Sequence, residues 1–197
     1  MCGRYARFSE VDRLLHPLGV RWEGPDLFPN YNTAPGQPVL AVRQRDAHRE
    51  AVLLRWGLIP AWAKDKAVGY RMINARAEGI ADKPAFRQPF RHQRCLIPAD
   101  GFYEWRPDDG RKQPWYIHRR DGEPLAFAGL WARWQDSEVI ESCAIITGAP
   151  NAVVAPIHDR MPVILEPADY TAWLESDNPL LLQQLLQPLP AELLEAY

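Results

Sequence analysis

The sequence has few cysteines, few lysines, no long apolar run and almost no net charge. No apolar run approaches the roughly 20 residues of a membrane-spanning helix, and the first residues lack the apolar segment of a secretory signal. A formal net charge of −2 excludes a strong overall positive field, so a polyanion site needs a local basic patch. The cysteines, Cys2, Cys95 and Cys143, have no metal-ligand spacing, and their odd count favours a reducing compartment. We therefore expect a cytoplasmic protein without a membrane anchor, metal or cofactor.

The remaining composition is that of an ordinary globular chain. The 197 residues are 47% hydrophobic and 24% charged, which suits one domain with a sizeable core. The 19 prolines are spread along the chain and indicate many turns and short elements rather than a helical bundle. Only four of the 23 basic residues are lysine. Arginine suits phosphate recognition, but a GC-rich genome gives the same bias, and composition does not separate the two explanations.

The apolar pattern predicts a run of strands followed by helices. We expect loops at 21–38 and 58–70 and a polar hairpin tip at 107–113. Helices are expected at 9–18, 166–174 and 179–186, with a last helical turn or two within 191–196. Strands are expected at 39–43, 51–56, 94–98, 102–105, 115–118, 125–131 and 139–147. The pattern predicts an α+β fold over residues 1–197: a single domain with a mostly antiparallel, barrel-like β core and peripheral helices.

Cys2 is the most informative residue of the chain. Initiator methionine is normally removed when the next residue is small, and loss of Met1 leaves Cys2 with a free α-amine beside its thiol. Such a 1,2-aminothiol condenses with an aldehyde through the amine and closes through the thiol to a thiazolidine ring. The ordinary pKa values, about 7.7–8.0 for the amine and about 8.5 for the thiol, need only modest tuning by the fold. Retention of Met1 would lock the amine in a peptide bond and close this route.

Three further polar residues interrupt apolar runs: Asn74, Glu104 and His158. Glu104 lies in an aromatic stretch, where burial would raise its carboxyl pKa and suit it to acid–base catalysis. A histidine titrates near neutrality, so His158 could protonate the ring oxygen of a cyclic sugar. Asn74 could orient Cys2 through amide hydrogen bonds. A turn cap, a solvent-facing strand position, a structural hydrogen bond and an incidental cysteine would explain the same four residues, and their spacing does not show that they converge.

Arginines follow three of these four residues two positions later: Arg4, Arg76 and Arg160. Residues i and i+2 share one face of an extended strand, so the arginines would line the side that carries the reactive groups. Guanidinium groups bind phosphate in bidentate fashion, which suits a phosphodiester ligand around a reactive sugar. Three ordinary surface salt bridges would give the same pattern.

Six ordered blocks between residue 1 and about residue 165 together resemble the SOS response-associated peptidase (SRAP) family. The blocks are MCGR (1–4), YNTAPG (31–36), WGLIP (56–60), INARAE (73–78), PADGFYEW (98–105) and IHDRMP (157–162). The resemblance implies a shield for abasic sites in single-stranded DNA, formed when the N-terminal cysteine cross-links the ring-opened sugar. It implies that Cys2 is the nucleophile and that Asn74 positions it. Glu104 then corresponds to the acid–base residue of cross-link formation and reversal, and His158 to the residue that assists ring opening.

The same resemblance implies a DNA-binding surface. Arg4, Arg76 and Arg160 match phosphate contacts of the family, and Asn32 belongs with the DNA-binding residues. Trp62 falls where the family places side chains that stack on bases. We expect a monomer that acts on single-stranded DNA, cytoplasmic and nucleoid-associated when bound. Family members usually continue into a further C-terminal segment, so we expect this chain to end before it.

Several rival functions remain open on the sequence alone. The family name records an autopeptidase that would remove Met1, and unmasking of Cys2 is compatible with cross-linking. A cysteine peptidase acting on other proteins needs an oxyanion hole that the sequence does not reveal. A class II glutamine amidotransferase also opens on Cys2, but the later blocks do not resemble that family. A non-covalent reader of modified DNA bases would leave Cys2 without a role.

Overall fold

The computed structural model describes residues 2–197 and is built from short strands with single-turn helices between them. The α-helices are α1 (Val11–Leu15), α2 (Arg87–His92), α3 (Tyr170–Glu175) and α4 (Pro179–Gln184). Short 3₁₀ helices span His16–Leu18, Lys66–Arg71, Pro167–Asp169 and Ala191–Leu193. The strands are β1 (Arg4–Arg7), β2 (Asn30–Thr33), β3 (Pro38–Arg45), β4 (His48–Trp56), β5 (Asn74–Arg76), β6 (Arg94–Ala99), β7 (Gly101–Asp108), β8 (Arg111–Arg119), β9 (Leu125–Gln135), β10 (Val139–Gly148), β11 (Met161–Pro162) and β12 (Leu194–Ala196).

Five of the strands close into a barrel. They are hydrogen-bonded in the order β10-β4-β3-β6-β9, and β9 returns to pair with β10. All neighbours in this ring are antiparallel except β4 and β10, and the short β5 also runs parallel to β10. Closure removes the free edges that an open sheet of these strands would present. The predicted α+β fold with a mostly antiparallel, barrel-like core is confirmed.

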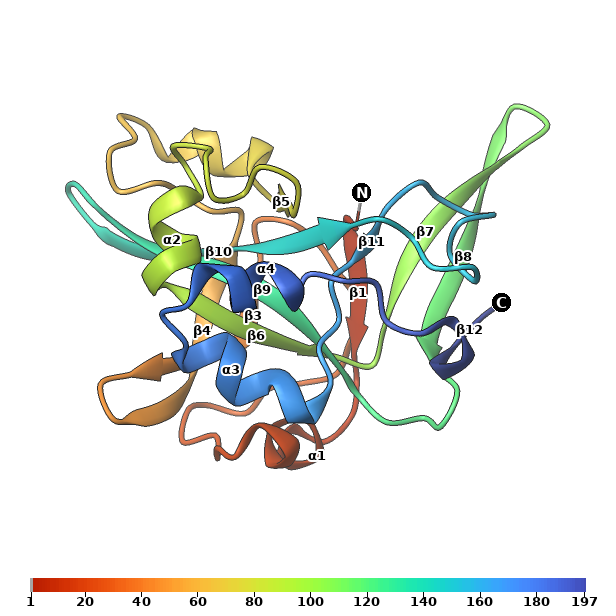
Figure 1. Cartoon of the computed structure of the whole chain (residues 1–197), viewed down its shortest axis with the longest axis horizontal. Helices are drawn as coiled ribbons and strands as arrows, with labels where there is room; N and C mark the ends of the chain where they lie inside the picture. The colour runs from red at the N-terminus through yellow and green to blue at the C-terminus, as the bar shows by residue number, and fades with distance from the viewer. Residues whose placement is uncertain (1) are drawn as a thin grey trace.

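A second, five-stranded antiparallel sheet packs on the barrel, with strand order β12-β8-β7-β1-β2. Its inner face carries Tyr5, Phe102 and Ile117, all fully buried. The Tyr5 ring lies 5.4 Å from the ring of Trp56 on β4, centroid to centroid. These side chains join the barrel interior in one apolar cluster, and Cys2 belongs to it. In Figure 1 the start of β1 and the end of β10 both lie near the middle of the view.

The helices pack on the barrel and close a second apolar cluster. α2 packs on β6 and β9, α3 packs on β3 and β6, and α4 packs on α3 (Figure 1). Phe90 of α2 and Trp173 of α3 are fully buried, with ring centroids 6.2 Å apart, and they share a cluster with Leu130 of β9. The described helices are all too short, or too polar, to cross a membrane.

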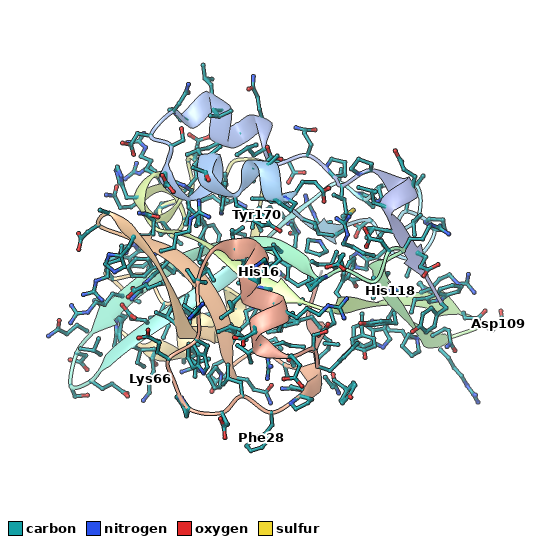
Figure 2. The ribbon with its side chains drawn as sticks, turned by 90° about the horizontal axis from the view of Figure 1, so that it is seen from below. His16, Phe28, Lys66, Asp109, His118 and Tyr170 are labelled. Carbon is teal, nitrogen blue, oxygen red and sulfur yellow. The ribbon has the colours of Figure 1, made fainter. Side chains whose placement is uncertain are left out.

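β7 and β8 continue beyond the sheet as a projecting hairpin, with Asp109 at its tip (Figure 2). Asp109 and Gly110 have positive φ values of 40° and 79°. Two such residues form the tight hairpin turn for which Asp-Gly is a favoured pair. The hairpin tip predicted at 107–113 is therefore too wide, because β7 ends at Asp108 and β8 begins at Arg111, which leaves a turn of two residues.

Two further sequence predictions are wrong, both where a short strand depends on a distant partner. The expected loop at 21–38 contains β2, which pairs with β1 through Tyr5 and Thr33. The residues at 191–196 form a 3₁₀ turn followed by β12, because Leu194–Ala196 pairs with the edge of β8. A three-residue strand has little propensity signal of its own. The other predicted strands and helices match the observed ones to within a few residues, the helix at 9–18 as α1 and a 3₁₀ turn.

Candidate active site

Cys2 lies just before β1 with a fully buried side chain. It belongs to the apolar cluster that also contains Tyr5, Ile145 and Ile157. Burial raises the pKa of the Cys2 thiol far above its usual range, and the charge of Glu104 raises it further. The thiol is therefore neutral at pH 7, contrary to the expectation that the fold eases its ionisation. Its use as a nucleophile requires a group that takes its proton.

Glu104 supplies a carboxylate on the inner face of β7. Its side chain is 2% exposed, so the solvent-facing alternative is wrong. Burial raises the pKa of the Glu104 carboxyl, and the charge of His158 opposes the shift. The direction is the one expected for a carboxyl among aromatic side chains, and it makes Glu104 able to hold a proton closer to neutrality than an exposed glutamate.

His158 reaches Glu104 from a turn between β10 and β11. The Asn151 Oδ1 accepts the backbone N–H groups of Val153 and Val154, each at 3.1 Å, and so fixes the turn. The backbone N–H of His158 donates to the Val154 carbonyl at 2.9 Å. This places His158 Nε2 3.8 Å from Glu104 Oε2. The two acid–base groups predicted from the sequence do converge.

The His158 ring has three polar neighbours at Nδ1. The backbone N–H of Arg160 lies 3.0 Å from Nδ1, the Arg160 carbonyl oxygen 3.2 Å and the Asp159 carboxylate 3.0 Å. The N–H donates to a ring with its lone pair on Nδ1, whereas the two oxygens accept from a ring with its proton there. The neighbours therefore fit either tautomer, and Nε2 faces Glu104 in both.

Asn74 presents an amide from β5, beside the end of β10. Its register partner is Ile145, and its Nδ2 donates weakly to the Ile145 carbonyl at 3.5 Å. Its Oδ1 is buried and accepts no hydrogen bond from any residue between 2 and 197. An unsatisfied buried amide oxygen costs about 1–3 kcal/mol. Asn74 thus has an acceptor available for an N–H group such as an amine.

The prediction that each arginine shares a strand face with its reactive neighbour is correct only for Arg76 and Asn74. Asn74 and Arg76 alternate with buried Ala75 on β5 and share a face, as predicted. Arg4 is in register with Tyr103, the neighbour of Glu104, so Arg4 and Glu104 project from opposite faces of the sheet. The Arg4 Nη1 donates to Asn32 Oδ1 of β2 at 3.0 Å. His158 and Arg160 lie in a turn, where the strand rule does not apply.

Arg76 and Arg160 both lie beside Thr147. Arg76 is exposed and in register with Thr147 on β10. The Arg160 Nη1 donates to the Thr147 carbonyl at 3.4 Å, and its guanidinium binds the Glu78 carboxylate. Two guanidinium groups thus lie beside the end of β10, one exposed and the other paired with a carboxylate.

Trp62 lies in the turn after Pro60 with 63% of its surface exposed. The loop behind it is anchored, because Trp134 Nε1 donates to the Ala63 carbonyl at 2.8 Å. An exposed indole on an anchored loop is a suitable platform for stacking an unpaired base. The expectation for Trp62 is therefore compatible with its placement.

Thr147 and Glu78 are candidate site residues that the sequence reasoning missed. The Thr147 hydroxyl is fully buried, and its Oγ1 has no hydrogen-bond partner in the described part of the chain. Its only sequence signal is that a hydroxyl ends the apolar run 143–146. Glu78 belongs to one of the recognised blocks, but its pairing with Arg160, 82 positions away, has no local signal.

No cluster of histidine, cysteine, aspartate or glutamate suited to a metal ion occurs within residues 2–197. The candidate site consists instead of a buried N-terminal cysteine, a buried carboxylate, a histidine and an amide, with arginines nearby. This arrangement is a candidate active site centred on a cysteine, on a protein with a closed β-barrel.

The chain belongs to the SOS response associated peptidase (SRAP) family, whose model matches residues 1–197. It is 45% identical to the abasic site processing protein YoqW of Bacillus subtilis (strain 168), over all of this chain and 91% of the relative. It is 33% identical to the abasic site processing protein YedK of Escherichia coli (strain K12), over 90% of this chain and 81% of the relative. Identity to the abasic site processing protein HMCES of Rattus norvegicus is 30%, over 89% of this chain and 64% of the relative.

Solved structures have the same fold. A crystal structure of a protein from Bacteroides thetaiotaomicron superposes with a TM-score of 0.90 at 28% identity, covering all of this chain and 91% of the other. A protein from Bordetella bronchiseptica superposes with a TM-score of 0.86, also at 28% identity, covering 99% of this chain and 98% of the other. The predicted family and the fold are confirmed.

Proposed function

We propose that this protein processes abasic sites in single-stranded DNA by forming a covalent thiazolidine between Cys2 and the ring-opened sugar. The single observation that carries the proposal is the pairing of buried Glu104 with His158, near enough to the buried Cys2 thiol for the Glu104 charge to act on it. The names of the relatives, abasic site processing proteins, support the substrate class. The protein acts as a monomer in the cytoplasm, without metal or cofactor.

The reaction begins once Met1 has been removed. The Cys2 amine adds to the C1′ aldehyde of the opened deoxyribose, and the carbinolamine loses water to give an imine. The Cys2 sulfur then adds to the imine carbon and forms the C–S bond, while the thiol proton moves to the imine nitrogen. The sum is aldehyde plus aminothiol giving thiazolidine plus one water, with no change of oxidation state.

Each side chain has a definite part in this sequence. Glu104 takes the proton of the neutral thiol and returns it to nitrogen. His158 protonates the sugar ring oxygen and so opens the closed sugar to the aldehyde. The Asn74 oxygen accepts a hydrogen bond from the Cys2 amine and orients it. Arg4, Asn32, Arg76 and Arg160 bind the flanking phosphates, and Trp62 stacks on an exposed base.

Intact-mass spectrometry tests the proposal. Purified protein is incubated with a single-stranded oligonucleotide that contains one abasic site. The expected product has the mass of the protein without methionine plus that of the oligonucleotide, less one water. Cys2→Ala must abolish it. Cys143→Ala is the matched control, because Cys143 is equally buried in the same apolar cluster but has no α-amine. Adduct from Cys2→Ala, or none from the demethionylated protein, would refute the proposal.

Self-removal of Met1 is a second candidate activity, consistent with the family's description as a peptidase. The favouring observation is that the Cys2 thiol lies beside a proton acceptor, Glu104. Protein produced with methionine aminopeptidase inhibited should lose Met1 during incubation alone. A mass that stays constant would assign the removal to another enzyme.

A further inference from the structure

One ion pair beside the site is not explained by the proposed chemistry. The Arg160 guanidinium donates to both oxygens of Glu78, from Nη1 to Oε1 at 3.3 Å and from Nη2 to Oε2 at 2.7 Å. The Arg160 side chain is 18% exposed, whereas that of Glu78 is 61% exposed. Exposed ion pairs contribute little stability, so stability alone does not explain why an exposed carboxylate holds both ends of a half-buried guanidinium.

The bonding pattern leaves a phosphate-binding edge open. Glu78 occupies the end of the guanidinium, Nη1 and Nη2, and the Thr147 carbonyl accepts a third bond from Nη1. Within residues 2–197, no hydrogen bond from Arg160 Nε is found. The Nε and Nη2 hydrogens form a second, parallel pair of donors, the geometry that suits two oxygens of a phosphate. A carboxylate bound at the Nε–Nη2 edge would instead occupy the donors that such a phosphate needs.

We infer that Glu78 is a positioning residue, which fixes Arg160 so that its side edge binds a phosphate of the DNA strand. The inference rests on the proposed function and adds to it the residue that orients the phosphate contact. Glu78 closely follows β5, the strand of Asn74 and Arg76, and Arg160 closely follows His158. The ion pair therefore ties the strand that carries Asn74 to the turn that carries His158.

For Glu78→Gln, a positioning role and simple electrostatics predict opposite changes in DNA affinity. Glu78→Gln removes one negative charge next to a DNA-binding surface, which by itself strengthens binding of a polyanion. Loss of positioning weakens it instead, because the guanidinium must then be ordered by the phosphate alone. We expect Glu78→Gln to bind DNA about two- to fivefold more weakly, which corresponds to one exposed ion pair.

The experiment uses the full chain and an undamaged single-stranded oligonucleotide, so that no covalent step contributes. Fluorescence anisotropy at several salt concentrations gives the affinity and its salt dependence for wild type, Glu78→Gln, Arg160→Ala and the double variant. Arg160→Ala should weaken binding about tenfold or more and flatten the slope by about 0.7, the value of one phosphate contact on a single strand. In the Arg160→Ala background, Glu78→Gln should cause no further loss of affinity, because the two residues act through one contact, and removal of its charge should leave binding unchanged or slightly tighter.

A matched control exists on α3. Glu175 binds Arg49 Nη2 at 3.2 Å, with side-chain exposures of 44% and 20%, close to those of the Glu78 pair. Glu175→Gln removes the same charge and should leave DNA affinity unchanged or slightly higher. The unfolding temperature of each variant is measured alongside, to exclude misfolding as the cause of weaker binding.

The outcomes separate this inference from the function on which it rests. Glu78→Gln binding as tightly as wild type, or more tightly, while Arg160→Ala binds weakly, would overturn the positioning role alone. Additive losses in the double variant would also overturn it. A wild-type protein that binds no single-stranded DNA would overturn both the inference and the proposed function.

Discussion

Replacement of Glu104 by glutamine should make the protein more stable and less active at the same time. The carboxylate is 2% exposed, and burial, the largest influence on it, raises its pKa. Keeping it ionised at neutral pH therefore costs folding free energy. Glutamine has nearly the same shape and no charge. We expect Glu104→Gln to raise the free energy of unfolding at pH 7.5 by about 1 kcal/mol, the usual size of one such gain. For a chain of this length that is about 2–4 °C in unfolding temperature.

The pH dependence gives the sharper test. A carboxyl whose pKa is raised on folding contributes stability that is fully present below its unfolded pKa, about 4.3. That contribution is lost as pH rises through the folded pKa. The difference in unfolding temperature between Glu104→Gln and wild type should thus be near zero at pH 4 and grow towards pH 7.5. Glu138→Gln, which removes a half-exposed carboxylate paired with Lys66, is the control and should gain no stability at pH 7.5.

Glu104→Gln should be less active although it is more stable. Loss of a general acid–base group slows a reaction about 10²–10⁴-fold, so adduct formation followed on a denaturing gel should slow by that factor. Its rate in wild type should fall in mild acid as Glu104 is protonated, and this limb should be absent in the variant. A Glu104→Gln protein that is less stable at pH 7.5, or that cross-links at the wild-type rate, would refute the assignment.

Two further predictions concern binding and packing. Trp62→Ala should weaken binding of an undamaged single-stranded oligonucleotide by about 1–3 kcal/mol, the value of one base–aromatic stack, with an unchanged unfolding temperature, because the indole is exposed. Equal anisotropy curves for the two proteins would exclude stacking. Gly101→Ala should destabilise the protein by about 1–3 kcal/mol in urea unfolding, because a Cβ there would lie 2.5 Å from Tyr116 Cζ and 2.6 Å from the Ile117 carbonyl oxygen. An unchanged urea midpoint would mean that β8 shifts at no cost.

Local patterns predicted the barrel strands, and distant pairings decided the rest. Apolar runs in the sequence predicted the barrel strands at 94–98, 125–131 and 139–147. The pKa direction of Glu104 followed from its aromatic neighbours. The pairing of β12 with β8 and of Glu78 with Arg160 joins positions more than 70 residues apart, and no local propensity encodes such partners. The burial of Cys2 could not be predicted from its local sequence either, because it results from the packing of the five-stranded sheet on the barrel.

The two raised pKa values in the site have one cause and one mechanistic consequence. Burial disfavours both a Cys2 thiolate and a Glu104 carboxylate, and each negative charge disfavours the other. The site therefore favours a single negative charge, which rests on Glu104 while the thiol is neutral. Formation of the thiolate costs least when its proton passes to Glu104, which leaves the carboxylic acid beside the imine nitrogen that must be protonated next. On the proposed mechanism, activation of the nucleophile and delivery of the acid are then one proton transfer. A carboxylate exposed to water, with an ordinary pKa, would hold that proton too weakly to do both.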